Sequence, residues 1–484
     1  MKARLVARGF QELDKEQSDS PTAQRESLRL FLSAAANIRV QSLRSIDISA
    51  AYLQSDELNR DVFLEVPKDI REDGMVWKLN KPLYGLTDAG RKFWISFKKW
   101  IEKNGYERMN GDNAFYYKRV EGELVGMILL HVDDVIIAGD NEFVDETTKM
   151  ISDRFNMSKV CDGEFRFCGL DIKLQRDGSI TVSMDDYADS IEPMVIDKKR
   201  KKTEEITYKE VSTLKELVGK LAWLAHNMRM DMCYGAVYLQ KRSNKATVAD
   251  VLYANKLVEK GKARKNEIRF VRVGDKDELI MYGLGDASYT AGEGKSSALG
   301  GQLVLLGTAK RPVVSSVLWK SKSIKVVCKS PKDAETINNC IVCDKTRHLA
   351  NQMSDLLFGR AGKRIPVVVF TDSLGTVESV ASTKQVERNL MRQHVFALQS
   401  HLEGGEVESL NWLPDEMMVS DILTKEMKTK DGLDSLLYKN RLGSVMTRDN
   451  SVMYRDNEFE ITGRKLREKL APKKNPPMKK KVKK

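Results

Sequence analysis

The stretch LVGMILLHVDDVIIAGD, residues 124–140, decides the fold of the N-terminal part of the chain. Two apolar runs flank Asp133 and Asp134, and this pattern predicts a buried β-hairpin within residues 114–139 with the two acids at its tight turn. Two neighbouring carboxylates beside an apolar wall repel each other and lose hydration, and a bound metal ion offsets both costs. A plain polar hairpin turn is the alternative, because Asp is a common turn residue.

The segments on either side of this hairpin predict further elements. Residues 28–37 predict a helix, and residues 40–48 predict a strand followed by a short helix. Asp47 lies near the end of that strand, where carboxylates often bind metal, although alone it is equally an ordinary strand-end residue. Paired magnesium ions held by such acids can activate a 3′-hydroxyl and stabilise a leaving oxygen. Residues 89–105 repeat Phe and Trp at helical spacing and stop at a glycine.

The second half of the chain has a different pattern. The basic run KKRKK at 198–202 marks a boundary, as a solvated connector or as a patch that follows a nucleic-acid strand. Thr213 and Glu216 have the spacing of a capping box at the start of a helix. A helical module from about 204 to 265 follows. Strands are then predicted, with helices between them as in an α/β unit, at 278–284, 302–306, 314–319 and 366–371.

Four acids lie at the predicted element ends of this α/β unit. Asp286 follows the first strand, Asp372 ends the strand PVVVFTD, and Asp421 begins DILTK after another strand. Ser330, Pro331 and Asp333 fit the N-cap, N1 and N3 positions of a helix that presents Glu335 early. A two-metal nuclease requires acids placed in this way, whereas any one of them alone is more often a cap or a surface group.

Composition excludes several classes of protein. The 484 residues, 41% of them hydrophobic, suffice for about three domains with real cores. No apolar stretch approaches the roughly 18 residues of a membrane helix, and residues 1–11 lack the apolar core of a signal peptide. Six scattered cysteines indicate reduced thiols rather than a disulfide framework. Cys340 and Cys343, with His348 nearby, have no second close cysteine pair, so we expect core packing rather than zinc binding.

The net charge is concentrated at one end of the chain. Residues 464–484 carry +10 of the formal charge of +12, so the remainder carries only +2. A nucleic-acid surface in the body must therefore come from local clusters. The tail predicts sequence-independent binding to phosphates, disorder, and either a nuclear-import signal or a solvating segment.

Several motifs in one order resemble the reverse transcriptase of copia-type LTR retrotransposons. The motifs are KARLVARGF (2–10), SIDISAAYLQSDEL (45–58), KLNKPLYGLTDAGRKFW (78–94) and LLHVDDVIIAGD (129–140). The segment LVGKLAWLAHNMRMDMCYGAVYL (217–239) is similar to the one that joins polymerase to ribonuclease H in that family. The resemblance runs from residue 2 to about 430, and several motifs in register are more specific than any one.

The resemblance implies a fold and a set of domains. The fold is an α+β polymerase palm and fingers with an antiparallel sheet, a helical connection and an α/β ribonuclease H-like domain. The implied bounds are 1–195 for the palm and incomplete fingers, 196–270 for the thumb-like connection, 271–445 for the ribonuclease H-like domain and 446–484 for a mostly disordered basic tail. Because the chain begins inside the family's fingers segment, we expect weakened polymerisation if the first finger strands are absent.

The resemblance also implies the site residues. Asp47 and Asp133 would hold two magnesium ions in the polymerase site, and Asp134 would support them. Two magnesium ions would bind the ribonuclease H set as well, with Glu335 in the glutamate position and Asp333 as a less suitable substitute. That set is Asp286, Glu335, Asp372 and Asp421. The nucleotide-binding residues implied are Lys2, Arg4, Arg8, Tyr84 and Gly85, although the three basic ones equally fit a solvated strand.

Three departures from the family pattern bear on polymerisation. His131 replaces the usual Tyr or Phe before x-D-D, where an aromatic ring packs near the primer end. The loop Thr87–Gly90 replaces Lys-Gln-Ala-Pro, which loses a positive charge and adds a negative one near the expected template path. Met230 stands where Pro is usual.

Three hypotheses follow from the sequence. The first is a reverse transcriptase with ribonuclease H that binds RNA template, DNA primer, RNA–DNA hybrid and deoxynucleoside triphosphates. The second is a nuclease on an inactive polymerase scaffold, and the third is a nucleic-acid-binding remnant. Retention of all seven acids favours the first, and the altered loop favours the others. An intracellular protein of the cytoplasm, and of the nucleus if the tail is an import signal, is expected; oligomeric state and host are not indicated.

Overall fold

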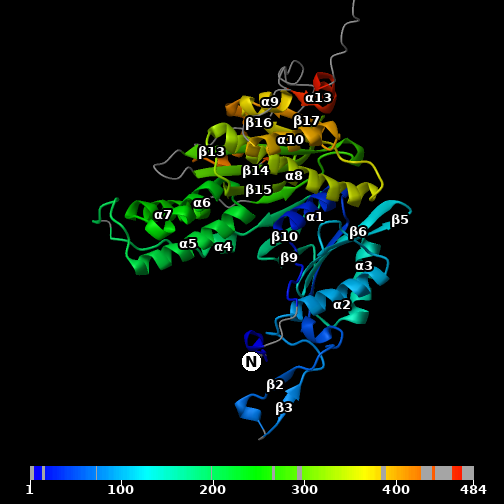
Figure 1. Cartoon of the computed structure of the whole chain (residues 1–484). Coiled ribbons are helices and arrows are strands. Elements are labelled where there is room, and N and C mark those ends of the chain that lie inside the picture. Colours follow the sequence, from blue (N-terminus) through cyan, green and yellow to red (C-terminus); the bar gives the residue numbers. More distant parts are fainter. Residues whose placement is uncertain are drawn as a thin grey trace, which may run out of the picture.

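A computed structural model of the chain has a mixed α/β fold with antiparallel sheets and helices, which is compatible with the predicted polymerase fold (Figure 1). The described residues are 5–12, 17–71, 74–197, 199–263, 267–290, 297–382, 389–426, 436, 439–441 and 460–470. Lys2, Arg4, Lys198 and residues 471–484 therefore lie outside them. In this described part, no helix is both long enough and apolar enough to cross a membrane.

The N-terminal sheet has six strands in the order β4-β5-β6-β7-β1-β8, all antiparallel. The predicted hairpin of residues 114–139 is a meander of three strands, because a second tight turn lies at residues 121–122. The strands of this sheet are β1 (Ser42–Ile48), β4 (Glu107–Arg108), β5 (Phe115–Val120), β6 (Glu123–His131), β7 (Asp134–Gly139) and β8 (Met157–Asp162).

Both faces of this sheet are covered, which explains the unbroken apolar runs around Asp133 and Asp134. Val135 and Ile137 of β7 pack in one core with α2 (Ala89–Lys103) and α3 (Asn141–Arg154). Ile136 and Ala138 point to the opposite face, where they share a core with α1 (Arg25–Ile38). Polar residues are therefore left to the strand ends, where the predicted polymerase acids lie.

A second antiparallel sheet and a group of helices follow. The sheet has the order β12-β11-β10-β9, and its strands are β9 (Glu164–Phe167), β10 (Leu170–Leu174), β11 (Ile180–Ser183) and β12 (Ile268–Phe270). The helices are α4 (Asp185–Asp189), α5 (Tyr208–Asn227), α6 (Cys233–Arg242) and α7 (Val248–Ala263). Figure 1 shows α5, α6 and α7 beside the C-terminal sheet, in agreement with the contact of α6 with β15.

The helix α5 begins earlier than the sequence predicted. Thr207 is its N-cap, and it forms the capping box with Glu210, whose side chain accepts from the Thr207 N–H at 2.7 Å. The predicted capping box of Thr213 and Glu216 is wrong, because Thr213 lies inside the helix and donates its hydroxyl to the Lys209 carbonyl. Both pairs have the same spacing, so spacing alone did not distinguish them.

The C-terminal sheet has six strands in the order β15-β14-β13-β16-β17-β18. The pairs β13–β16 and β16–β17 are parallel and the others antiparallel, and α8 packs on β13 and β14. The strands are β13 (Leu279–Thr290), β14 (Ser297–Thr308), β15 (Ser315–Ile324), β16 (Val367–Thr371), β17 (Ser409–Trp412) and β18 (Ile461–Thr462). The helices are α8 (Pro331–Phe358), α9 (Leu374–Ala381), α10 (Asn389–Glu403) and α13 (Gly463–Leu470). The four predicted strands of this unit are confirmed.

The expectation of a structureless tail is wrong for residues 461–470. The strand β18 pairs with β17, and Ile461 and Leu466 are buried in the main core. Two apolar residues among many charges gave too weak a periodic signal to predict an element there. The bounds of the four predicted domains stay a prediction.

A buried arginine connects the N-terminal helix to the other units. The Arg29 guanidinium of α1 lies 3.2 Å from the centre of the Trp319 ring in β15 and donates to the Asn227 carbonyl at the end of α5. The Trp319 indole N–H donates to the Ala225 carbonyl at 3.1 Å. Cys340 and Cys343 of α8 are also buried in this core, as predicted.

Smaller elements connect these units in the described part of the chain. They are the 3-10 turns η1 (Gly9–Gln11), η2 (Ala51–Gln54), η3 (Lys68–Ile70), η4 (Met230–Met232), η5 (Ser243–Lys245), η6 (Lys276–Glu278), η7 (Asp415–Met417) and η8 (Val419–Leu423), with the hairpin of β2 (Phe63–Glu65) and β3 (Val76–Lys78). Figure 1 shows this hairpin at the opposite end of the molecule from α9 and α13.

Candidate active sites

The N-terminal candidate site lies at the turn between β6 and β7. Val132 occupies the left-handed region, with a φ of 59°, and Asp133 completes the two-residue turn. Asp134 is the first residue of β7 and is paired directly with Asp47 of β1. The Ile48 N–H donates to the Asp133 carbonyl at 2.9 Å. The antiparallel register therefore places the three predicted polymerase acids at one end of two adjacent strands.

The charges at this end of the sheet affect one another. The pKa of Asp134 is raised to about 6, first by burial and then by the nearby charges of Asp133 and Asp47. The Ser158 hydroxyl of β8 donates a hydrogen bond to the Asp47 carboxylate. A cation at this position would lower the electrostatic cost of keeping the three carboxylates ionised.

The carboxylates of Asp47, Asp133 and Asp134 do not form as close a group as the acids near the C-terminal sheet. Among the described residues, the two groups of acids whose ligand atoms all lie within 4.8 Å of one another are both formed by residues 286–421, on and beside the C-terminal sheet. His131 precedes the turn and is paired with Asp134, and its ring makes an edge contact with Phe167 at 6.2 Å between ring centres. The roles of Asp47, Asp133 and Asp134 in polymerisation remain a prediction.

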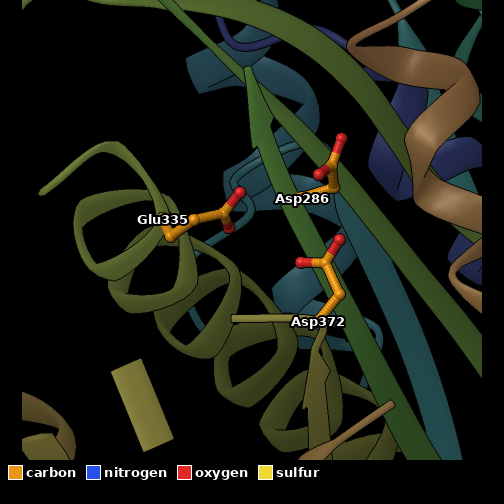
Figure 2. Close-up of side chains that lie close together, drawn as sticks. All are labelled: Asp286, Glu335 and Asp372. Atoms are coloured by element: carbon orange, nitrogen blue, oxygen red, sulfur yellow. The ribbon is translucent and has the colours of Figure 1, made fainter. Parts of the chain in front are cut away.

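The C-terminal candidate site joins three of the predicted acids, Asp286, Glu335 and Asp372, as Figure 2 shows. Asp286 lies inside β13, which runs on to Thr290, so the predicted position after the strand is wrong. Asp372 follows β16 directly. Gly285 of β13 is paired in parallel with Thr371 of β16. Asp286 and Asp372 are the residues that follow this pair, so they lie at the same level of the sheet.

Glu335 reaches the same place from the first turns of α8. The predicted cap is confirmed: Ser330 is the N-cap, its side chain accepts from the Asp333 N–H, and Pro331 is the first helical residue. The Asp333 side chain accepts from the Lys329 N–H at 2.8 Å and so takes part in the cap. Glu335, rather than Asp333, is therefore the acid that faces Asp286 and Asp372.

Glu335 has the environment that fits a metal ligand most clearly. Its side chain is only 9% exposed, and one oxygen, Oε1, accepts from the Ala287 N–H at 2.9 Å. The other oxygen, Oε2, is buried without a hydrogen-bond partner. Burial and then the charges of Asp286 and Asp372 raise its pKa well above the usual value. Burying an ionised oxygen without a partner is costly, so this position fits a metal ligand.

The neighbouring acids share this electrostatic environment. The pKa of Asp286 is raised to about 6 by burial and then by Asp372, and that of Asp372 to about 6 by burial and then by Asp421. Several buried carboxylates with raised pKa values offer hard oxygen ligands, which suit a divalent ion such as magnesium. The donor set therefore fits a divalent cation.

Asp421 belongs to a second group, which contains an acid that the sequence did not single out. Asp372, Asp415 and Asp421 each place a carboxylate oxygen within 4.8 Å of the other two. Asp421 lies in η8, and its pKa is raised to about 6 by burial and then by Asp286. Asp415 opens η7 and contacts Lys425, as does Asp421. The segment DEMMVSDILTK (415–425) contains Asp415, Asp421 and Lys425, but only the fold shows that they meet Asp372.

The residues predicted to bind nucleotide lie where the chain passes close to itself. The Tyr84 carbonyl accepts from the Ala7 N–H at 2.7 Å, and the Gly85 carbonyl accepts from the Gly9 N–H at 3.1 Å. Gly85 has a φ of 93°, and a Cβ there would lie 2.0 Å from the Ala7 oxygen. The predicted close approach at Gly85 is thus present, with the chain's own backbone as partner. Arg8 in this segment is exposed, and Lys2 and Arg4 lie outside the described residues.

The altered loop Thr87–Gly90 does not present its negative charge to solvent. Asp88 is buried, and one of its oxygens lies 3.1 Å from the Arg60 guanidinium. Arg60 also pairs with Glu12, which accepts from the Thr87 hydroxyl. The added negative charge is thus held in an internal ion pair with Arg60, and its effect on a template path stays a prediction. This pair holds the loop against the N-terminal segment.

Comparisons with known proteins agree with this arrangement. Residues 1–207 match the family model of reverse transcriptase (RNA-dependent DNA polymerase). The chain is 32% identical over 166 residues to the Retrovirus-related Pol polyprotein from transposon TNT 1-94 of Nicotiana tabacum, covering 33% of this chain and 12% of that protein. It is 25% identical over 409 residues to the Retrovirus-related Pol polyprotein from transposon RE1 of Arabidopsis thaliana, covering 77% and 26%. The Transposon Ty1-DR6 Gag-Pol polyprotein of Saccharomyces cerevisiae is 24% identical over 470 residues, covering 89% and 25%.

The match over residues 1–207 places that part of the chain in the reverse transcriptase class. Over most of its length the chain is similar to the Pol polyproteins of copia-type retrotransposons, which confirms the resemblance noted in its sequence. It spans between about an eighth and about a quarter of the length of the three relatives named above.

Proposed function

We propose that the protein is an RNA-directed DNA polymerase with ribonuclease H activity on RNA–DNA hybrids. The observation that carries the nuclease half is the group of Asp286, Glu335 and Asp372, whose ligand atoms lie within 4.8 Å of one another around a buried Glu335 oxygen without a hydrogen-bond partner. The family match over residues 1–207 supports the polymerase half. The substrates would be an RNA template, a DNA primer, deoxynucleoside triphosphates and the hybrid product.

In the polymerase site, Asp47 and Asp133 would bind two magnesium ions and Asp134 would support them. Such ions activate the primer 3′-hydroxyl and stabilise the leaving phosphate oxygen. The chain's own contribution is positioning, because the β1–β7 register fixes Asp47 beside Asp134 and the β6–β7 turn fixes Asp133. Lys2, Arg4 and Arg8 would contact the triphosphate.

In the nuclease site, Asp286, Glu335 and Asp372 would hold one magnesium ion, and Asp372 and Asp421 a second. The strands β13 and β16 fix two of these acids side by side, and the cap of α8 fixes Glu335 opposite them. Burial of the group excludes bulk water, which strengthens the interaction of each carboxylate with a cation. The RNA strand of the hybrid would then be bound beside these acids.

A protein that acts only as a nuclease is the second candidate. The predicted nuclease acids Asp286, Glu335 and Asp372 form a close group, whereas within the described part of the chain the polymerase acids do not. Cleavage of hybrids without primer extension, by protein that is shown to be folded, would favour this candidate.

The nuclease half is tested by cleavage of an RNA–DNA hybrid with magnesium, comparing wild type, Glu335→Gln and Asp333→Asn. Glu335→Gln removes a charged ligand at nearly constant volume, and we expect cleavage to fall at least about 100-fold. Asp333→Asn is the matched control, because an Asn side chain still accepts the Lys329 N–H. Loss of cleavage in the control alone would show that the wrong acid was assigned.

A further inference from the structure

A lysine, Lys425, contacts the acids of the proposed nuclease site. The sequence alone did not single out this lysine. The Lys425 ammonium lies 3.1 Å from an Asp421 oxygen and 3.2 Å from an Asp415 oxygen. Asp421 is buried, Asp415 is exposed, and the Lys425 side chain is 44% exposed. The ammonium therefore lies at the solvent side of the group, between a buried and an exposed acid.

The two groups of acids share one member. Asp372 belongs both to the group with Asp286 and Glu335 and to the group with Asp415 and Asp421. Each group could hold one cation, with Asp372 as the carboxylate that the two groups share. In the first subsite a buried Glu335 oxygen has no hydrogen-bond partner, and in the second Lys425 contacts two of the three acids. The second subsite therefore already contains a positive charge.

The backbone holds Lys425 in this position. Its N–H donates to the Asp421 carbonyl at 2.9 Å, and the preceding Thr424 hydroxyl donates to the Asp286 carboxylate. Gly301 of β14 is paired with Asp286, and a Cβ at Gly301 would lie 2.9 Å from the Thr424 side chain. The absence of a side chain at Gly301 thus allows the segment of η8 to lie directly over the acids.

We propose that Lys425 is a positioning residue that competes with the second divalent ion of the nuclease site, and that Asp415 is a ligand of that second ion. The first ion binds at Asp286, Glu335 and Asp372, with which Lys425 forms no direct ion pair, although its charge also acts on them. The second ion binds only when the ammonium leaves Asp415 and Asp421, which a long flexible lysine side chain at a half-exposed position permits. This inference rests on the metal site of the proposed nuclease.

The test is a calorimetric titration of the full chain with Mn²⁺. Both Asp133→Asn and Asp134→Asn are included in every protein, so that polymerase-site binding does not contribute. We expect one tighter and one weaker ion, and Lys425→Met should tighten the weaker one by about tenfold, because a competing charge is removed. Lys425→Arg keeps the charge and should bind as the parent does. Lys363→Met, which removes a half-exposed lysine paired with Asp277, is the matched control.

The substitution Asp415→Asn tests the proposed second ligand independently. It should weaken the second ion several-fold and leave the first unchanged, a pattern that loss of stability alone does not produce. Unchanged or weaker Mn²⁺ binding by folded Lys425→Met would overturn the inference. Lys425 would then serve only to hold Asp415 and Asp421 together. If Asp286→Asn binds as much Mn²⁺ as its parent, the metal site itself is absent, and both the proposed nuclease and this inference are overturned.

Discussion

Removing one charge from the nuclease site should stabilise the protein when no metal is bound. The pKa of Asp286 rises from 3.8 to about 6, so ionising this buried group in the folded state costs about 3 kcal/mol at about 1.4 kcal/mol per unit of pKa. Asp286→Asn removes that cost, and an Asn oxygen can still accept from Thr424. Because the neighbouring acids share the repulsion, we expect a gain of about 1–3 kcal/mol at pH 8.

The sign of the pH dependence follows from the raised pKa. Between about pH 4 and pH 6 the folded state binds more protons at Asp286 than the unfolded state does, so stability falls as the pH rises through this window. The gain from Asp286→Asn is therefore largest above pH 6, smaller at pH 5 and absent below pH 4.

The assay is thermal unfolding in EDTA at pH 8 and pH 5, and with magnesium at pH 8. A gain of 1 kcal/mol corresponds to roughly 2–4 °C for a unit of 150–250 residues. Magnesium should raise the Tm of the wild type and have less effect on Asp286→Asn, since the variant lacks a ligand. Asp344→Asn, at an exposed acid of α8, is the control. A lower Tm for Asp286→Asn in EDTA at pH 8 would refute the argument from charge repulsion.

Three further predictions concern other parts of the chain. Thr207→Ala should destabilise the start of α5 by about 1 kcal/mol and lower amide protection there in hydrogen exchange, whereas Thr213→Ala should do neither; equal effects would restore the capping box first predicted. Gly301→Ala should impair hybrid cleavage more than primer extension, because the new Cβ would clash with the η8 segment. Unaltered cleavage would show that this segment can shift to accommodate the Cβ. Deleting residues 471–484, which contain seven lysines, should reduce the salt dependence of nucleic-acid binding, and an unchanged slope would exclude the tail as a phosphate-binding segment.

Much of the fold could be predicted from local patterns. The apolar runs around Asp133 and Asp134 predicted a buried hairpin, and the structure has strands on both sides of that turn. The Ser330 cap predicted the start of α8 and thereby the place of Glu335. These predictions succeeded because turn chemistry and helix capping depend on residues close together in sequence.

Features that depend on tertiary contacts could not be predicted. Asp415 and Lys425 join the acidic group only because two short 3-10 turns bring them beside Asp421. Asp88 is buried in an ion pair with Arg60, which lies 28 residues earlier in the chain. The strand β18 also depends on its partner, because its own two residues carry little signal.

Primer extension on an RNA template with magnesium tests the central claim most directly. The account predicts DNA synthesis by the wild-type chain, loss of synthesis in Asp133→Asn, and retention of synthesis in Asp372→Asn, which alters only the nuclease site. Absence of synthesis by folded wild-type protein that still cleaves hybrids would contradict the polymerase assignment and leave a nuclease. Synthesis that persists in Asp133→Asn would contradict the location of the polymerase site.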